Sequence, residues 1–206
     1  MNRAAKFWNR WAERYSKQPV ANEEVYQVKL KRTQAHFDPS MTILEFGCGT
    51  GSTAITHSPF VKNIRAIDVS SKMIEIAKAK AAKQNINNID FEVTTLDDLV
   101  CEKNSMDAVL GLSILHLLPN WKESIANVQQ LLKPNGIFVS STPCMKHLWP
   151  LRLLAPIAQF FGLIPSLSFF NPEELKNALT ESGFDIEHFW QPGKNTGVFI
   201  IARKKS

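Results

Sequence analysis

The sequence predicts an α/β fold, built on a doubly wound, mostly parallel sheet of seven strands whose last strand is antiparallel. Three observations indicate this fold. Short apolar runs alternate with helical stretches, a glycine-rich turn follows the first apolar run, and only a short turn separates the last two runs. Alternating strands and helices form right-handed crossovers, which place helices on both faces of the sheet.

Length and composition describe one folded domain. The 206 residues suffice for a single α/β domain with a sizeable core, and 44% hydrophobic with 21% charged residues is typical of globular proteins. The three cysteines are widely spaced and contain no CxxC pair, so neither a disulfide framework nor a metal site is expected. The charged, aromatic N-terminus does not resemble a signal peptide, so the chain is expected to be cytoplasmic.

Residues 1–37 are expected to form an N-terminal lid of two helices. Residues 3–17 predict the first helix, in which aromatic side chains recur at every fourth position and share one face: Phe7, Trp11 and Tyr15. Residues 22–37 predict the second helix, which Asn22 would cap.

Residues 38–143 are expected to form the core of the domain. Five apolar runs in it are typical of buried parallel strands: residues 41–46, 64–69, 89–93, 106–112 and 136–142. Two stretches between them predict helices. These are residues 71–84, with Ser70 or Ser71 as cap, and residues 121–133, closed by a Lys-Pro-Asn-Gly turn.

Residues 144–170 are expected to form an apolar helical cap after the fifth strand. Within them, residues 148–170 carry one formal charge, Arg152, and approach the length of a membrane span. Three prolines interrupt this segment, which favours a pair of short helices over a spanning helix.

Residues 171–206 predict a helix followed by a hairpin. The helix covers residues 171–183, with Asn171 as its cap. Strands at residues 184–190 and 197–203 flank a turn bounded by glycines, so the last strand is expected to be antiparallel.

The turn after the first predicted strand contains Gly47, Gly49 and Gly51 at alternating positions. Residues without a Cβ atom allow a tight turn and a close approach of the backbone to a ligand, so this turn is expected to form the floor of a binding site. Dinucleotide sites use the spacing G-x-G-x-x-G, but in this sequence Ser52 occupies the position of the third glycine. In addition, the carboxylate of Glu45 precedes the loop. A carboxylate disfavours phosphate and attracts a cation, so the expected ligand is cationic.

Asp68 closes the second predicted strand, seventeen residues after Gly51. A carboxylate at this position can accept hydrogen bonds from both hydroxyls of a ribose. A small cationic group beside a ribose, without a phosphate, describes S-adenosyl-L-methionine.

Four stretches resemble the successive motifs of the class I S-adenosylmethionine-dependent methyltransferases, in particular their small-molecule branch: LEFGCGTG, AIDVS, MDAVLGLSILHLL and LLKPNGIFVSSTP. The resemblance covers about residues 4–205. It implies a single methyltransferase domain over residues 1–206, with a Rossmann-like sheet in which residues 38–143 bind the cofactor.

The same resemblance assigns residues to the parts of S-adenosylmethionine. Asp68 would hold the ribose, and Val69 and Met73 would flank the adenine. The methionine part would lie against Glu45, the glycine loop and the end of the fourth strand, which contribute Glu45, Gly47, Cys48, Gly49, Gly51 and Gly111.

Thr95 and Leu96 stand where the family often has an acidic residue and a backbone N–H group that contact the adenine. This chain departs from the pattern, because its carboxylates, Asp97 and Asp98, come just afterwards. Either the Thr95 hydroxyl or a shifted Asp97 would then contact the adenine amino group. Asp97 and Asp98 could equally belong to a solvated loop or the start of a helix.

Methyl transfer from a sulfonium needs mainly positioning, and it needs an acid–base residue only when the nucleophile holds its proton at neutral pH. By the same resemblance His116 is a candidate base, the alternative being a histidine hydrogen-bonded to its loop backbone. Tyr15 resembles a lid element that covers the cofactor, and core packing is the alternative. Cys144 lacks the partner motif of the cytosine-5 methyltransferases, so no nucleophilic role is expected for it.

The expected acceptor is a small, hydrophobic molecule. The tetrad N/D-P-P-Y, typical of enzymes that methylate exocyclic or amide nitrogens, is replaced by residues 111–114, and the scattered basic residues do not indicate a nucleic-acid surface. The apolar residues 148–170 favour a hydrophobic acceptor or a shallow contact with a membrane surface. Two alternatives stay open: a nicotinamide-dependent oxidoreductase, which Ser52 and Glu45 disfavour, and a non-catalytic, membrane-associated module that binds S-adenosylmethionine.

Overall fold

The computed structural model describes residues 3–160, 162–193 and 196–206. The strands are β1 Thr42–Phe46, β2 Asn63–Asp68, β3 Ile89–Val93, β4 Met106–Leu112, β5 Leu132–Thr142, β6 Phe184–Trp190 and β7 Val198–Lys204. The helices are α1 Arg3–Ser16, α2 Glu23–Gln34, α3 Ser52–His57, α4 Ser71–Lys83, α5 Trp121–Leu131, α6 Trp149–Phe160 and α7 Pro172–Glu181, with short 3-10 turns at Ser58–Phe60 and Leu115–Leu117.

The strands form one sheet in the order β3-β2-β1-β4-β5-β7-β6. Strands β1 to β5 pair with one another in parallel, whereas β7 is antiparallel to both β5 and β6. The direction in which the chain adds strands reverses between β1 and β4, and ligands of such sheets bind at the carboxyl ends of the strands at that point. The predicted fold class, including the antiparallel last strand, is confirmed.

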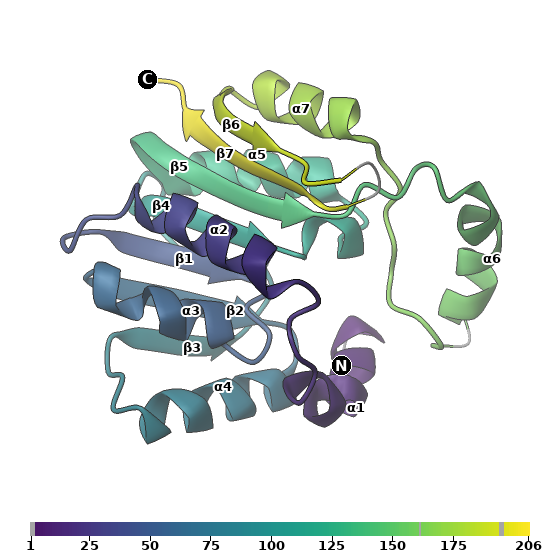
Figure 1. Cartoon of the computed structure of the whole chain (residues 1–206), viewed down its shortest axis with the longest axis horizontal. Coiled ribbons are helices and arrows are strands. Elements are labelled where there is room, and N and C mark those ends of the chain that lie inside the picture. Colours follow the sequence, from purple (N-terminus) through teal and green to yellow (C-terminus); the bar gives the residue numbers. More distant parts are fainter. Residues whose placement is uncertain (1–2, 161, 194–195) are drawn as a thin grey trace.

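Helices cover both faces of the sheet (Figure 1). Helices α2, α3 and α4 lie over one face, and α5 and α7 lie over the other. Alternate residues of a strand point to opposite faces, so Ile43 belongs to one buried apolar cluster and Leu44 and Phe46 belong to the other. The two clusters fix the sheet rigidly between its helical layers.

Most elements lie within a few residues of their predicted bounds, and three predicted caps are confirmed. The side chains of Asn22, Ser70 and Asn171 accept hydrogen bonds from the first turns of α2, α4 and α7. At α7, the Glu174 side chain accepts a hydrogen bond from the Asn171 backbone N–H, which completes a capping box.

The start of β5 differs from the prediction. Helix α5 ends at Leu131, and β5 already begins at Leu132, so residues 133–136 do not close a helix. Leu132 pairs with Met106, the register then shifts, and pairing resumes at Ile137 opposite Ala108. Asn135 takes a left-handed backbone conformation with φ 64° inside this irregularity, so the residues expected to form a turn belong to a bulged strand.

The apolar cap also differs from the predicted pair of helices. In its described part, residues 144–170 contain the single helix α6, which Pro156 does not end. The following segment is extended and held by the loop after β4. Ser168 donates its N–H to the His116 carbonyl at 2.7 Å and its hydroxyl to the Leu118 carbonyl at 2.6 Å. Within the described ranges, no helix is both long and apolar enough to cross a bilayer.

Helix α1 is fixed to the start of α4 and does not continue into α2. The Asn9 side chain accepts a hydrogen bond from the Ser70 hydroxyl at 2.7 Å and another from the Lys72 N–H. Of the three aromatic residues expected on one face of α1, Phe7 lies beside Trp11 with a tilted ring, and the Tyr15 ring meets that of Trp8, with centroids 6.1 Å apart. Residues 8 and 15 are seven positions apart, which is close to two turns of an α-helix, so their side chains lie one above the other.

Candidate functional site

Two adjoining cavities lie at the carboxyl ends of β1, β2 and β4. The first, which we call the Asp68 cavity, has a volume of about 130 Å³. The second, the Glu45 cavity, has a volume of about 770 Å³ and is lined in part by α2 and α3. Both cavities are bordered by the same junction residues: Tyr15, Gly47, Gly49, Leu112 and Ser113.

The glycine loop lies between the two cavities and leaves them connected, because two of its residues carry no side chain there. Gly47 and Gly49 have positive φ angles of 66° and 55°, which side-chain-bearing residues rarely adopt. A Cβ atom at Gly47 would lie 2.7 Å from Ile114, and one at Gly49 would point toward the Tyr15 ring at 3.7 Å. The space between Gly49 and Tyr15 is therefore kept open by the sequence itself.

Asp68 connects the glycine loop to the end of β2. One carboxylate oxygen accepts the Gly49 N–H at 3.0 Å and the other accepts the Ser70 N–H at 2.8 Å. Burial raises the pKa of this carboxyl group, and the two backbone bonds counteract that rise. Each oxygen keeps lone-pair capacity toward the cavity, so the side chain can accept from two adjacent hydroxyls.

Glu45 is the most enclosed carboxyl group of the site. Its residue is 3% exposed, and its Oε2 has no hydrogen-bond partner within the described part of the chain. Burial, and next the charge of Asp68, raise the pKa of Glu45 to about 8. A cation reaching Oε2 would satisfy a buried acceptor and favour the ionised form.

The Tyr15 ring closes the junction from the side of α1. Burial first, then the charges of Asp68 and Glu45, raise the pKa of its phenol, so the hydroxyl keeps its proton at neutral pH. Tyr15 can thus donate a hydrogen bond but cannot act as a base. Trp8, which no sequence pattern indicated, lies beside it in the wall of the Asp68 cavity.

The loop after β3 brings Thr95 and Leu96 to the Asp68 cavity. Asp98 accepts a hydrogen bond from the Thr95 hydroxyl at 2.7 Å, whereas Asp97 pairs with Asn127 away from the cavity walls. Of the two expected adenine contacts, the geometry favours Thr95.

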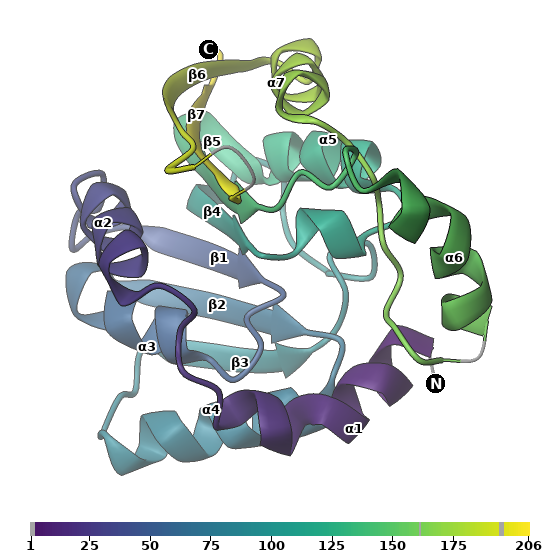
Figure 2. The ribbon, with the colours of Figure 1, turned by 45° about the vertical axis from the view of Figure 1, so that its right-hand side comes forward.

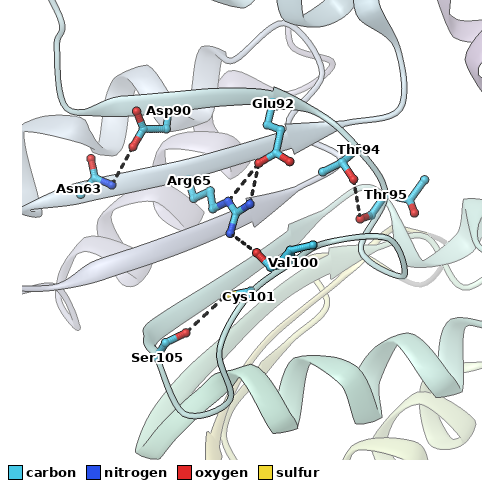
Figure 3. Close-up of polar contacts among 9 residues, drawn as sticks. All are labelled: Asn63, Arg65, Asp90, Glu92, Thr94, Thr95, Val100, Cys101 and Ser105. Atoms are coloured by element: carbon cyan, nitrogen blue, oxygen red, sulfur yellow. Dashed lines mark hydrogen bonds and ion pairs between the residues drawn. The ribbon is translucent and has the colours of Figure 1, made fainter.

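A fork of hydrogen bonds holds this loop in place (Figure 3). Arg65 donates from Nε and Nη2 to Glu92 on the neighbouring strand and from Nη1 to the Val100 carbonyl at 2.8 Å. The loop is thereby fixed at both ends, and Thr95 lies between them (Figure 3). The sequence offered no signal for this contact, since it depends on the β2–β3 register.

His116 lies near the site, but its side chain lines neither cavity. Its Nδ1 is 3.2 Å from the Thr142 hydroxyl, and burial lowers its pKa to about 4, so the ring is neutral at pH 7. The expected alternative, a bond from this side chain to its own loop backbone, is replaced by the bond to Thr142. Burial also raises the pKa of Cys144 to about 11, so its thiol is protonated at neutral pH.

The structure places the remaining expected residues as follows. Gly51 and Gly111 are outside both cavities, where they allow close packing against Phe91 and Phe46. The Cys48 thiol is in the Glu45 cavity, and burial keeps its pKa well above the usual value. The Asp68 cavity gathers Tyr15, Gly47, Gly49, Asp68, Val69, Met73, Thr95 and Leu96.

Other residues of the walls were not selected from the sequence. The Asp68 cavity also contacts the apolar side chains Trp8, Phe46, Ile67, Ile114, Leu117 and Leu118. The Glu45 cavity adds Tyr26, Lys29, Thr33 and His57. Nowhere in the described ranges are three or more His, Cys, Asp or Glu side chains grouped to hold a metal ion.

These features fit S-adenosylmethionine. Asp68 matches the two ribose hydroxyls, the unpartnered Glu45 Oε2 matches an ammonium group, and the open space above Gly49 joins the two cavities that they face. The described wall of the Asp68 cavity contains no cationic side chain that would favour a pyrophosphate.

Comparisons with known proteins agree with this fit. The family model for a methyltransferase domain matches residues 20–189. The ubiquinone biosynthesis O-methyltransferase of Rickettsia canadensis (strain McKiel) is 30% identical over 167 residues, which are 77% of this chain and 69% of that protein. The demethylmenaquinone methyltransferase of Leptospira interrogans is 28% identical over 145 residues, which are 68% of this chain and 57% of that protein.

Solved structures share the fold. Geranyl diphosphate C-methyltransferase from Streptomyces coelicolor, in complex with Mg²⁺, geranyl diphosphate and S-adenosyl-L-homocysteine, has a TM-score of 0.76 at 12% identity, over 98% of this chain and 97% of that one. YcgJ from Bacillus subtilis has a TM-score of 0.73 at 14% identity, over 87% and 99%. None of these relatives and solved structures supports the oxidoreductase or the non-catalytic alternative.

Replacing Asp68 should weaken the binding of S-adenosylmethionine. Asp68→Ala would remove the side chain that we expect to accept two ribose hydroxyls, and the loss should cost roughly 1.5–3 kcal/mol of binding free energy, measured by titration calorimetry. Asp90→Ala, which removes an exposed carboxylate on β3 outside both cavities, is the matched control and should bind normally. An unchanged affinity in Asp68→Ala would place the ribose elsewhere.

The affinity for S-adenosylmethionine should rise with pH. Glu45 is protonated below its pKa of about 8 and must lose that proton to bind an ammonium group, so affinity should increase between about pH 6 and pH 7.5, by at most about tenfold per pH unit. Glu45→Gln should remove this dependence. A flat profile in the unmodified protein, or an equal slope in the variant, would contradict the assignment.

Proposed function

This chain belongs to the class I S-adenosylmethionine-dependent methyltransferases, and we propose that its acceptor is a small molecule with an apolar body. S-adenosylmethionine, the methyl donor of this family, supplies a methyl group on a sulfonium that is already an activated leaving group. The protein then has to hold the two reactants in line and keep water out.

The observation that supports an apolar acceptor is the composition of the Asp68 cavity wall. Beside the single carboxylate of Asp68, the wall is formed by large apolar side chains from α1 and from the loop after β4, including Trp8, Ile114, Leu117 and Leu118. Such a wall favours an apolar ligand and excludes water from the reacting atoms.

Helices α1 and α6 lie at the same end of the molecule, beyond the carboxyl ends of the strands (Figure 2). Arg10 of α1 donates a hydrogen bond to the Gly162 carbonyl after α6 at 2.8 Å, so the two helices are connected. We assign to them the role of covering the acceptor. Tyr15, whose phenol stays protonated, would orient the acceptor or the cofactor by donating a hydrogen bond.

His116 is retained as the base for an acceptor that holds its proton at neutral pH. Its neutral imidazole has the required lone pair, and its ring must turn from Thr142 toward the Asp68 cavity to use it. For an acceptor that ionises unaided, His116 would instead position Thr142 at the end of β5.

The relatives support an apolar acceptor of the quinone-precursor kind. Two of them carry the names ubiquinone biosynthesis O-methyltransferase and demethylmenaquinone methyltransferase. This chain spans only 69% and 57% of their respective lengths, so the proposal extends to the chemical class of the acceptor and no further.

Contact with an anionic membrane surface is a second part of the proposal. Among the side chains around α6 that the structure describes, three large apolar ones are more than 60% exposed: Leu154, Ile157 and Leu163. The basic Arg152 is exposed on the same helix, and the chain carries a net charge of +5. Exposed apolar side chains beside a cation favour a shallow position at an anionic lipid interface.

The function is tested by following the methyl group. The protein is incubated with S-adenosylmethionine labelled in its methyl group and with a cell extract, and the labelled product is identified by mass spectrometry. Label should enter a small compound that partitions into organic solvent, and Asp68→Ala should lower the yield. Label in protein or nucleic acid, or none above the level without enzyme, would contradict the proposed acceptor class.

The membrane contact is tested by co-sedimentation with vesicles. The protein should pellet with phosphatidylglycerol vesicles more than with phosphatidylcholine vesicles, and a double variant, Leu154→Glu with Ile157→Glu, should stay in solution. Val100→Glu changes an apolar residue in the loop after β3 that is even more exposed, at 87%, and serves as control. Absence of the unmodified protein from both pellets would refute this part.

A further inference from the structure

Lys80 of α4 forms hydrogen bonds with two side chains of the glycine loop. Its Nζ donates to the Thr50 hydroxyl at 2.8 Å and to the Ser52 hydroxyl at 3.2 Å. Thr50 and Ser52 flank Gly51, whose φ angle of 74° lies in the left-handed region. One ammonium group therefore connects the side chains on either side of this glycine.

Helix α4 also packs directly against the loop. A Cβ atom at Gly51 would lie 2.8 Å from the Cβ atom of Ala77, so the close approach of α4 depends on the glycine. Ala77 and Lys80 are three positions apart and therefore share one face of the helix. The loop thus meets α4 at two neighbouring side chains, one apolar and one charged.

The ammonium group of Lys80 has no carboxylate partner within the described ranges. Both of its acceptors are neutral hydroxyls, and none of the ion pairs there includes it. The side chain is half-buried, and burial lowers its pKa. Partial removal of a charge from water is unfavourable without a counter-ion, so the two hydrogen bonds to the loop have to compensate for it.

The loop has a large amount of conformational freedom to lose. It contains Gly47, Gly49 and Gly51, and glycine loses more backbone freedom on ordering than any other residue. Thr50 lies between two of these glycines and is only 5% exposed. A hydrogen bond to its hydroxyl restricts the loop before a ligand binds, so less ordering opposes binding.

Lys80 itself is not part of the described wall of either cavity. Thr50 and Ser52 both line the Glu45 cavity, and Gly49 between them and Asp68 borders both cavities. Any effect of Lys80 on a ligand is therefore transmitted through the loop.

We propose that Lys80 is a positioning residue for S-adenosylmethionine, because its bonds to Thr50 and Ser52 hold the glycine loop in the shape that binds the cofactor. Asp68 fixes the same loop through the Gly49 N–H, so the loop is held from β2 and from α4. This inference rests on the binding of S-adenosylmethionine and is independent of the acceptor proposed above.

The first test measures the affinity for S-adenosylhomocysteine by titration calorimetry. Lys80→Met removes the ammonium group and should weaken binding roughly three- to tenfold, the scale of one net hydrogen bond. Lys80→Arg keeps two donors and should retain most of the affinity. Lys78→Met removes an exposed lysine from the same helix and should bind normally.

A double-mutant cycle tests whether Lys80 acts through the two hydroxyls. Thr50→Val with Ser52→Ala removes both acceptors. In that background, the further change Lys80→Met should alter the affinity less than twofold, because the bonds that it would break are already absent. A role of Lys80 that is confined to the stability of α4 would instead give effects that multiply.

Amide hydrogen exchange without ligand reports on the loop itself. The Gly51 N–H donates to the Cys48 carbonyl at 3.0 Å, and its exchange should become faster in Lys80→Met while the amides of the sheet keep their protection. If thermal unfolding shows that Lys80→Met is not folded, Thr50→Val with Ser52→Ala takes its place, since this pair removes the same two bonds.

Three results would overturn the inference: normal affinity in Lys80→Met, multiplying effects in the cycle, or an equal loss of affinity in Lys78→Met. Each of them would leave the cofactor assignment intact. Absence of S-adenosylhomocysteine binding by the unmodified protein would overturn the cofactor assignment and this inference together.

Discussion

The pair of hydrogen bonds that Asp68 accepts from the backbone of Gly49 and Ser70 is the contact on which the site depends. It joins the loop after β1, the end of β2 and the start of α4 at one carboxylate. Ser70 in turn caps α4 and bonds to Asn9, so the position of α1 follows from the same corner. This corner lies next to the reversal of strand order, where ligands of such sheets bind. Because hydrogen bonds already hold its backbone, a ligand has to order few further groups, and the entropy cost of binding is small.

The electrostatics of the site follow from that arrangement. Two carboxyl groups, Asp68 and Glu45, are buried near each other, and each has a raised pKa. A ligand with a ribose and a nearby positive charge would stabilise the ionised form of both groups. The ribose hydroxyls would donate hydrogen bonds to Asp68, and the positive charge would pair with Glu45. The cation Lys29 also lines the Glu45 cavity, on the side of β5, where its Nζ donates a hydrogen bond to the Ser141 hydroxyl.

The sequence predicted most of what is local. The helix caps, the apolar strands and the glycine loop depend on residues close together in the chain, and spacing alone placed Asp68 at the end of its strand. The sequence-based predictions failed where strand register or tertiary packing determines the local structure. The bulge at residues 133–136 arises from how β5 pairs with β4, and the single helix α6 from how the following segment binds the loop after β4. Lys29, Trp8 and Arg65 reach the site or its loop from separate elements, so no spacing indicates them.

The most direct measurement is a crystal structure of the protein with S-adenosylhomocysteine. The account predicts both ribose hydroxyls on the Asp68 carboxylate, the amino group at Glu45 Oε2, and the sulfur above Gly49 facing the Tyr15 ring. Density for the adenosine away from Asp68, or an amino-acid end directed away from Glu45, would contradict it.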